Sequence, residues 1–359
     1  MELNAQRCSL PNMTARAGWY AGQLRQELMV RARRHARGHA HVESYGNPPV
    51  IVFEPEDGRH GNFFDESYRA IAARPEWMRR FDKIHTQGNR SLPKPELDPR
   101  RRWRELDSSM SSDALLMNVF CAPGVAESAA VRAALGVGVD GLPEFGLKAR
   151  VQLVTGRFDR TEVDMRLGSL LVEAKLTEGD FQTREARIVE AYRDFDAVFD
   201  RELLPRVDLT QVRRKEAVEF PEAYSQEYES LVDETMPRAL IEELQANSAS
   251  VVAADEFNAT RKAEPAYTGY QLIRNVLAAY AAECSFCVLH DERRPDLRED
   301  WFRVLAAVKS AAMRVRLKVL TWQELAAYMP EELQQFLDLK YGIVASGKTA
   351  SPVGEAVEF

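Results

Sequence analysis

The feature that most constrains the fold is a change in hydrophobic period near residue 150. Before this point apolar residues recur with helical spacing, whereas Thr161–Leu167 and Leu170–Leu176 have the pattern of β-strands. Gly168-Ser169 separates these two runs and is typical of a two-residue hairpin turn, in which glycine adopts a positive φ. The sequence therefore predicts an antiparallel β-hairpin over residues 161–176.

This hairpin would bring two acidic residues together. If Leu167 pairs with Leu170, Asp164 lies directly across from Glu173, and strand alternation places Lys175 on the same face. Cβ atoms of such cross-strand pairs are about 4.5–5.5 Å apart, and like charges there are destabilising. A divalent cation would remove the conflict, because Mg²⁺ binds one or two carboxylates while it keeps several waters. We predict that Asp164 and Glu173 bind Mg²⁺, with Mn²⁺ able to substitute, beside Lys175.

The spacing Asp-x8-Glu-x-Lys across a hairpin resembles the PD-(D/E)xK nuclease superfamily. Two further blocks, Ser111–Asn118 and Tyr270–Arg274, are similar to segments of a poorly characterised, restriction-endonuclease-like branch of it, so the resemblance covers about residues 105–320. It implies an α/β fold with a restriction-endonuclease-like mixed β-sheet core flanked by helices. It also implies that Asp164 and Glu173 are metal ligands and Lys175 is the catalytic lysine. Val163 stands where many members have a proline.

Members of this superfamily often add a further acidic or amide side chain to the site. Asp113, Glu144 and Gln271 are candidates here, and no spacing rule selects one of them. Gln271, Arg274 and Asn275 would share one helical face. That face either flanks the metal and contacts the phosphate backbone or is a solvated polar surface.

Three regions are expected along the chain. They are a basic N-terminal extension (1–104), a nuclease-like domain (105–330) with a helical insertion at about 178–265, and a C-terminal helix and tail (331–359). A proline-interrupted stretch at 91–99 is the best candidate linker. Other predicted helices cover 17–37, 65–73, 114–120, 126–135, 180–202, 223–246, 268–283 and 298–313, and other predicted strands cover 50–53, 151–158, 285–290 and 315–320.

Charge is distributed unevenly along the 359 residues. The net charge is −7, which argues against a general polyanion binder, but residues 1–104 hold 19 basic and 12 acidic residues. The densest basic runs are Arg31–Arg37 and Arg100–Arg104. They are either solvated helix faces or a surface that contacts nucleic acid.

Other motifs do not carry a function. The stretch Gly342–Thr349 matches a phosphate-binding loop by its letters, but it lacks a preceding strand and a following helix. Gly136–Gly141 follows a helix and is expected to be a loop. Cys284 and Cys287 would face opposite sides of a strand, which favours core packing over zinc binding. The histidines at 39, 41 and 60 are expected at the surface or in loops.

Together these features predict a metal-dependent nuclease that hydrolyses phosphodiester bonds, acts on DNA and has the site residues Asp164, Glu173, Lys175 and Gln271. The alternative is a catalytically inactive nucleic-acid-binding or protein-interaction module with the same fold. No apolar run approaches the length of a membrane span, and the four cysteines suggest reduced thiols, so we expect a cytoplasmic protein. A homodimer would suit an enzyme that cuts both strands.

Overall fold

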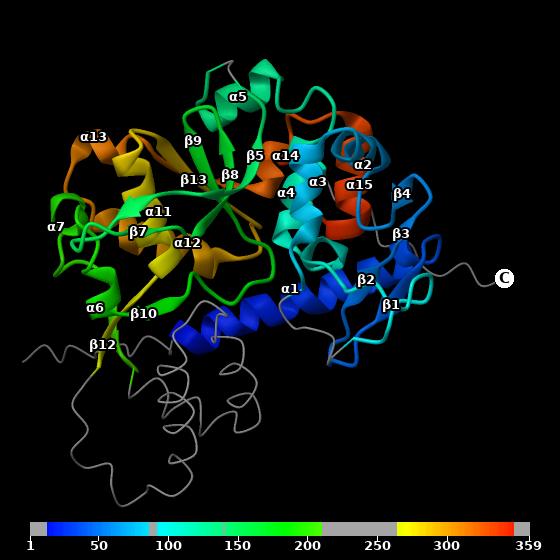
Figure 1. Cartoon of the computed structure of the whole chain (residues 1–359), viewed down its shortest axis with the longest axis horizontal. Coiled ribbons are helices and arrows are strands. Elements are labelled where there is room, and N and C mark those ends of the chain that lie inside the picture. The colour runs from blue at the N-terminus through cyan, green and yellow to red at the C-terminus, as the bar shows by residue number, and fades with distance from the viewer. Residues whose placement is uncertain (1–12, 86–91, 139–140, 210–263, 348–359) are drawn as a thin grey trace, which may run out of the picture.

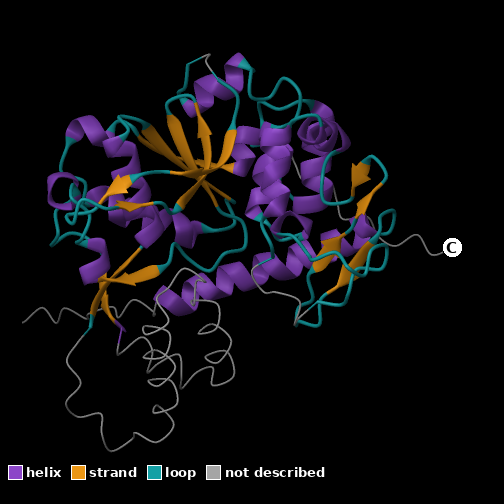
Figure 2. Ribbon diagram, viewed as in Figure 1, coloured by secondary structure: helices purple, strands orange, loops and turns teal. Residues whose placement is uncertain are grey.

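The computed structural model describes residues 13–85, 92–138, 141–209 and 264–347. At its centre lies a five-stranded mixed sheet (Figure 2). Its three middle strands contain the apolar runs that the sequence predicts to be strands. They are β13 (Ser285–His290), β9 (Leu170–Ala174) and β8 (Glu162–Leu167). β14 and β13 are parallel, as are β13 and β9, whereas β8 is antiparallel to both β9 and β5. The strand order is β14 (Leu317–Thr321), β13 (Ser285–His290), β9 (Leu170–Ala174), β8 (Glu162–Leu167) and β5 (Glu144–Lys148).

Helices cover both faces of this sheet, so the fold is the mixed α/β class that the sequence predicts. One face packs against α11 (Tyr270–Ala281) and α12 (Pro295–Ala306), and the other packs against α4 (Ser112–Phe120) and α14 (Trp322–Ala326) (Figure 1). Because both faces are covered, β9 is buried along its whole length. Polar side chains on this strand are therefore forced into the interior.

The N-terminal region packs against the same core. The long helix α1 (Met13–Ala36) contacts α15 (Glu331–Tyr341) and α12, and its Leu24 and Leu28 join the apolar cluster beneath the sheet (Figure 1). The other elements of this region are β1 (His41–Glu43), β2 (Ile51–Phe53), β3 (Pro55–Glu56), β4 (Arg59–His60), α2 (Asp65–Ala72), α3 (Pro75–Met78) and the 3-10 turns η1 (Arg79–Asp82) and η3 (Glu105–Asp107).

The stretch expected to be a linker is packed down in its described part. Leu92 and Pro95 are buried, and Glu54 accepts hydrogen bonds from the main-chain N–H groups of Glu96 and Leu97 at 2.6 and 2.9 Å. The prolines here prevent regular secondary structure, but they do not separate the chain into independent parts.

Two strand predictions need correction. The predicted strand 151–158 is instead two short strands, β6 (Val151–Gln152) and β7 (Phe158–Asp159), joined by a turn in which Gly156 has a φ of 81°. β5 was not predicted, because Gly146 and the neighbouring glycines suggest a loop. It nevertheless forms the edge of the central sheet beside β8.

The helix predicted at 180–202 is also wrong. This stretch contains β10 (Thr183–Glu185) and two single-turn helices, α6 (Ala186–Val189) and α7 (Phe195–Val198). β10 pairs with β12 (Pro265–Thr268), which also pairs with β11 (Arg206–Asp208), so tertiary strand pairing overrides the local helical pattern. The helix predicted at 223–246 lies outside the described residues.

The helix predicted at 298–313 is instead two helices, since α12 ends at Ala306 and a separate short helix covers Ala311–Arg314, and the other predicted elements in the described residues agree to within a few residues. The elements not yet named are α5 (Ala129–Leu135) and α13 (Ala311–Arg314). Within the described residues, no helix combines the length and the apolar composition that a membrane crossing requires.

Candidate active site

The hairpin register agrees with the sequence prediction. Leu167 pairs with Leu170, and the ladder continues to Met165 opposite Val172. Gly168 supplies the turn with a φ of 56°. The regular pairing ends there, and the same register continued by one step brings Asp164 opposite Glu173, at the end of β9 remote from the turn.

Asp164 interrupts the ladder with its own side chain. Its Oδ2 accepts a hydrogen bond of 2.8 Å from the main-chain N–H of Ala174. On the other side, Asp164 faces Gly146 of β5, which adopts a φ of 65° between two regular pairs. A side chain at position 146 would collide with the guanidinium of Arg80, so glycine is required for close packing over Asp164.

Glu173 and Lys175 form a buried ion pair, with side chains only 2% and 6% exposed. Lys175 Nζ lies 2.9 Å from Glu173 Oε1, but this oxygen accepts no well-aligned hydrogen bond from any described residue. The other oxygen, Oε2, accepts a hydrogen bond of 2.8 Å from Asn275 Nδ2. Glu173 Oε1 is therefore ion-paired but poorly aligned with its partner, so it can still accept a further cation.

Helix α11 holds this pair from above the sheet. Gln271 Oε1 accepts a hydrogen bond of 2.9 Å from Lys175 Nζ, and Asn275, one turn later, contacts Glu173. The structure therefore places Gln271 directly against the predicted lysine. The spacing of four residues puts both amides on one helical face.

The interpretation of this face as a solvated polar surface is wrong. Arg274 and Asn275 are each 1% exposed. Arg274 donates hydrogen bonds to Asp159, Asn275 and the main-chain carbonyls of Ala149 and Thr161. It therefore fixes α11 against the loop that precedes β8, and it is not free to contact a phosphate.

A second group of charges adjoins Asp164 from the N-terminal region. Asp113, in the first turn of α4, is buried, and its Oδ2 lies 2.7 Å from Arg80 Nη2 and 3.2 Å from Lys83 Nζ. Arg80 also contacts Glu162 at 3.0 Å. Burial opposes the charge of Asp113, but Lys83 and Arg80 outweigh it, so its pKa is lowered. Asp113 remains an anion held by two cations.

The electrostatics of the three motif residues are coupled. Burial, followed by the charges of Glu173 and Asp113, raises the pKa of Asp164 well above its usual value, and Lys175 compensates only in part. For Lys175, burial opposes the charge, but Glu173, Glu178 and Asp164 outweigh it and raise its pKa. Lys175 therefore stays protonated, while burial and the neighbouring carboxylates disfavour the anion of Asp164.

The donor set at this position fits a hard divalent cation. No cluster of three or more His, Cys, Asp or Glu residues in the described part of the chain is arranged to hold a metal. Mg²⁺ does not need such a cluster, because it is usually bound through one or two carboxylates and retains water ligands. Glu173 Oε1 lacks an aligned hydrogen bond from a described residue, and burial together with the charges of Glu173 and Asp113 raises the pKa of Asp164. These two residues therefore suit Mg²⁺.

Other sequence candidates lie elsewhere. Glu144 is exposed on the edge strand β5, opposite Arg166. His60 is not a surface residue as expected, because it is fully buried and its Nε2 contacts Asp107 at 3.1 Å. Cys284 and Cys287 are free thiols in different apolar clusters on the two sides of the sheet, as predicted.

The two glycine-containing motifs to which the sequence analysis assigns no function, Gly136–Gly141 and Gly342–Thr349, each begin at the C-terminal end of a helix. Gly136 and Gly342 cap α5 and α15 in the left-handed conformation. The loop at 342–347 follows a helix, as expected from the sequence, and residues 348 and 349 of that motif lie outside the described residues.

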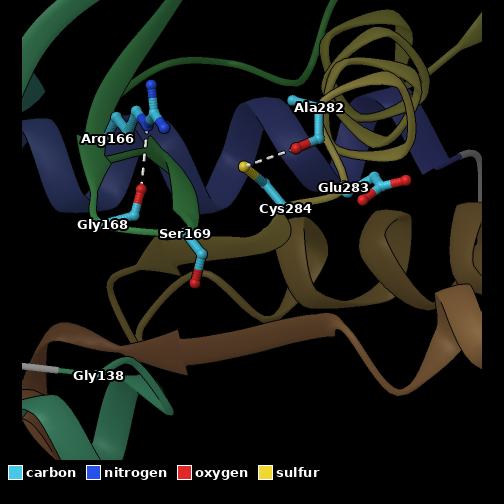
Figure 3. Close-up of a pocket in the computed structure, with 7 residues that line it drawn as sticks. All are labelled: Gly138, Arg166, Gly168, Ser169, Ala282, Glu283 and Cys284. Carbon is cyan, nitrogen blue, oxygen red and sulfur yellow. Dashed lines mark hydrogen bonds between the residues drawn. The ribbon is translucent and has the colours of Figure 1, made fainter. Parts of the chain in front are cut away.

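A pocket of about 360 Å³ lies at the hairpin turn, well away from this site (Figure 3). Its lining includes Arg166 and Ser169 from the hairpin and Glu283 from the end of α11. Ser169 and Lys175 are at opposite ends of β9, roughly 15–20 Å apart at the rise of an extended strand. Arg166 bonds the carbonyl of Gly168, and no carboxylate pair faces this pocket (Figure 3).

Three site residues were missed or not assigned from the sequence. Arg80 and Lys83 come from a part of the chain with no recognisable motif, and their position depends on tertiary packing of η1 against α4. Asn275 could be found only as the helical neighbour of Gln271. The signal available for all three was the expectation that basic N-terminal residues and the 270s helix contact the backbone of the nucleic acid.

Comparison with known protein families gives one clear relationship. The family REase-ARP, described as restriction endonuclease associating with ARP, matches residues 25–342. This range includes the hairpin, α11 and α4, and it extends the sequence resemblance through most of the N-terminal region. Searches of curated proteins and of solved structures return no match.

Proposed function

The chain belongs to the family of restriction endonucleases associating with ARP, and on that premise we propose that it is a Mg²⁺-dependent nuclease that hydrolyses phosphodiester bonds in DNA. Membership of a restriction-endonuclease family indicates nuclease chemistry on nucleic acid. The observation that supports the finer assignment is the buried group of Asp164, Glu173 and Lys175, in which Glu173 Oε1 lies 2.9 Å from the ammonium of Lys175 but accepts no well-aligned hydrogen bond from a described residue.

Asp164 and Glu173 would hold the metal ion in this proposal. When bound, Mg²⁺ would neutralise charge that develops on the phosphodiester and make water a better nucleophile. Asn275 fixes the carboxylate plane of Glu173 through Oε2, so that Oε1 stays directed toward the site. Burial, and then the charges of Glu173 and Asp113, raise the pKa of Asp164, and a bound cation would oppose both effects and favour the carboxylate.

Lys175 would act as a hydrogen-bond donor. Its raised pKa keeps the amine protonated near neutral pH, which favours orienting the attacking water or a phosphate oxygen over abstracting a proton. Gln271 Oε1 and Glu173 Oε1 hold Nζ at 2.9 Å each, so the ammonium has one defined position. Gln271 is therefore a positioning residue for Lys175.

Cleavage of single- and double-stranded DNA with Mg²⁺ or Mn²⁺ tests the proposal. Asp164→Ala and Lys175→Ala should each lower cleavage by at least about a hundredfold, as expected when a main source of transition-state stabilisation is removed. Both variants should melt cooperatively. Absence of metal-dependent cleavage by the wild-type protein on DNA would contradict the proposal, and the same assay on RNA would show whether the substrate class was misassigned.

The alternative of an inactive nucleic-acid-binding module predicts DNA binding without cleavage under any of these conditions. The family description also names an association with ARP, and for this chain such a partner is a further proposal. A homodimer and a cytoplasmic location likewise stay predictions, which chromatography with light scattering and cell fractionation would test.

A further inference from the structure

The N-terminal region places two basic side chains beside the acidic site, and they differ in accessibility. Arg80 is 7% exposed and is held between Asp113 and Glu162. Lys83 is 39% exposed, and among the described residues its close carboxylate contact is with Asp113, at 3.2 Å. Lys175, the third cation of the site, is only 6% exposed. Among these three cations, Lys83 alone can reach a ligand from solvent without opening of the fold.

The main chain fixes Lys83 at this position. It directly follows η1, and its carbonyl accepts a hydrogen bond of 2.9 Å from the N–H of Glu105. The next residue, Ile84, forms a β-bridge with Arg104. The backbone is therefore anchored on both sides, while the side chain stays 39% exposed.

The contact with Asp113 leaves hydrogen-bond donors of the Lys83 ammonium free for a ligand. Asp113 is already held by the shorter contact with Arg80, at 2.7 Å. The ammonium of Lys83 has three N–H donors, and the contact with Asp113 uses one of them. At least one donor therefore remains for another acceptor. A phosphate oxygen is the acceptor that a cation next to a nuclease site would meet.

We propose that Lys83 binds a backbone phosphate of the nucleic acid next to the bond that is cut, an inference that rests on the proposed nuclease function. Asp113 and Arg80 position Lys83, and a dication on Asp164 and Glu173 would reinforce its attraction for phosphate. The N-terminal region thereby supplies part of the substrate-binding surface of the site.

Salt-dependent binding tests this assignment without cleavage. Binding of a fluorescent duplex DNA is measured in EDTA over a series of KCl concentrations for the wild type, Lys83→Met and Lys83→Arg. Loss of one phosphate contact should make the slope of log affinity against log salt less steep by about 0.9, whereas Lys83→Arg should keep the wild-type slope. Lys309→Met is the matched control, because Lys309 is also exposed and its ammonium donates to the main-chain carbonyl of Asp196, within α7.

The kinetics of cleavage give a second readout. With Mg²⁺, Lys83→Met should raise KM by about tenfold with a smaller change in kcat, as expected for loss of one charge-assisted contact to substrate. Thermal melting of each variant shows whether it is folded. A wild type that does not cleave would refute the proposed function, while the salt slope would still decide the role of Lys83. An unchanged salt slope for folded Lys83→Met would overturn the inference.

Discussion

The main-chain N–H of Ala174 donates a hydrogen bond of 2.8 Å to Oδ2 of Asp164, so a side chain takes the place of a ladder acceptor at the end of the hairpin. This bond fixes the carboxylate of Asp164 against β9, next to Glu173. It explains how two acids that repel each other are held together before any cation binds. The pairing of β9 with β13 on its other side supplies the rigidity, and Lys175 N donates to Leu289 O at 2.8 Å.

Asn275→Ala should weaken both the fold and the metal site. The change leaves Oε2 of Glu173 without its donor in a buried position, which should cost about 1–3 kcal/mol of unfolding free energy. Asn275→Asp should cost more, because it places a further carboxylate against Glu173, and added Mg²⁺ should restore part of the loss. Urea unfolding with and without Mg²⁺ measures both effects, and equal stability of Asn275→Asp and wild type without metal would contradict them.

Gln271→Ala should slow cleavage through Lys175 and not through substrate affinity. Removal of the 2.9 Å contact to Nζ frees the ammonium to adopt other positions, and we expect kcat to fall by about tenfold with little change in KM. Gln271→Glu keeps an acceptor and should retain more activity than the alanine variant. Steady-state kinetics of the two variants check this, and a rise in KM alone would rule out the positioning role.

Gly146→Ala should destabilise the protein more than Gly156→Ala does. Both glycines have positive φ, 65° and 81°, so alanine is strained at each position. At 146 the new Cβ would also meet the guanidinium of Arg80, whereas at 156 no atom lies within 4 Å. We expect a further loss of about 1–3 kcal/mol at 146, measured by urea unfolding. Equal losses would show that Arg80 does not pack over β5.

Asp300 should make the protein less stable as the pH rises from about 4 to about 6. Burial, together with Asp180, Asp296 and Glu299, raises its pKa from the ordinary 3.8 to about 6 despite Arg303. The folded state therefore binds this proton more tightly than the unfolded state, and the associated stability is lost as pH rises through that window.

Asp300→Asn removes this titration. Its unfolding free energy should rise relative to that of the wild type between pH 4 and 6, and should be about 1 kcal/mol higher at pH 7. The difference is kept this small because the Asp300 side chain is 23% exposed, so solvent screens part of the effect. Glu66→Gln is the control, since Glu66 likewise pairs with an arginine three residues later on its helix, Arg69, but is 45% exposed. Parallel stability curves for wild type and Asp300→Asn would show that burial does not disfavour this charge.

The hairpin and its acidic pair could be predicted because their signals are local. Gly168-Ser169 sets the turn, the turn sets the register, and the register places Asp164 opposite Glu173. Gln271 could be proposed because a resemblance pointed to its helix. In each of these cases the deciding residues lie within a few positions of one another in the sequence.

The rest of the site depends on contacts between distant segments. Arg80 and Lys83 contact Asp113, which lies 33 and 30 residues away in the sequence. Hydrophobic periodicity does not predict that η1 packs on α4. The burial of Arg274 was missed because a polar helical face looks the same whether it meets water or internal carbonyls. β10 was missed because its partner β12 lies far along the chain.

The central claim is that Asp164 and Glu173 together hold a divalent cation, and calorimetric titration with Mn²⁺ tests it most directly. The wild type should bind Mn²⁺, and Asp164→Asn should bind at least about tenfold more weakly, because it removes one of two anionic ligands. Glu162→Gln, which changes a neighbouring carboxylate on β8 that contacts Arg80, should bind as the wild type does. Absence of Mn²⁺ binding to the wild type, or undiminished binding to Asp164→Asn, would contradict the account.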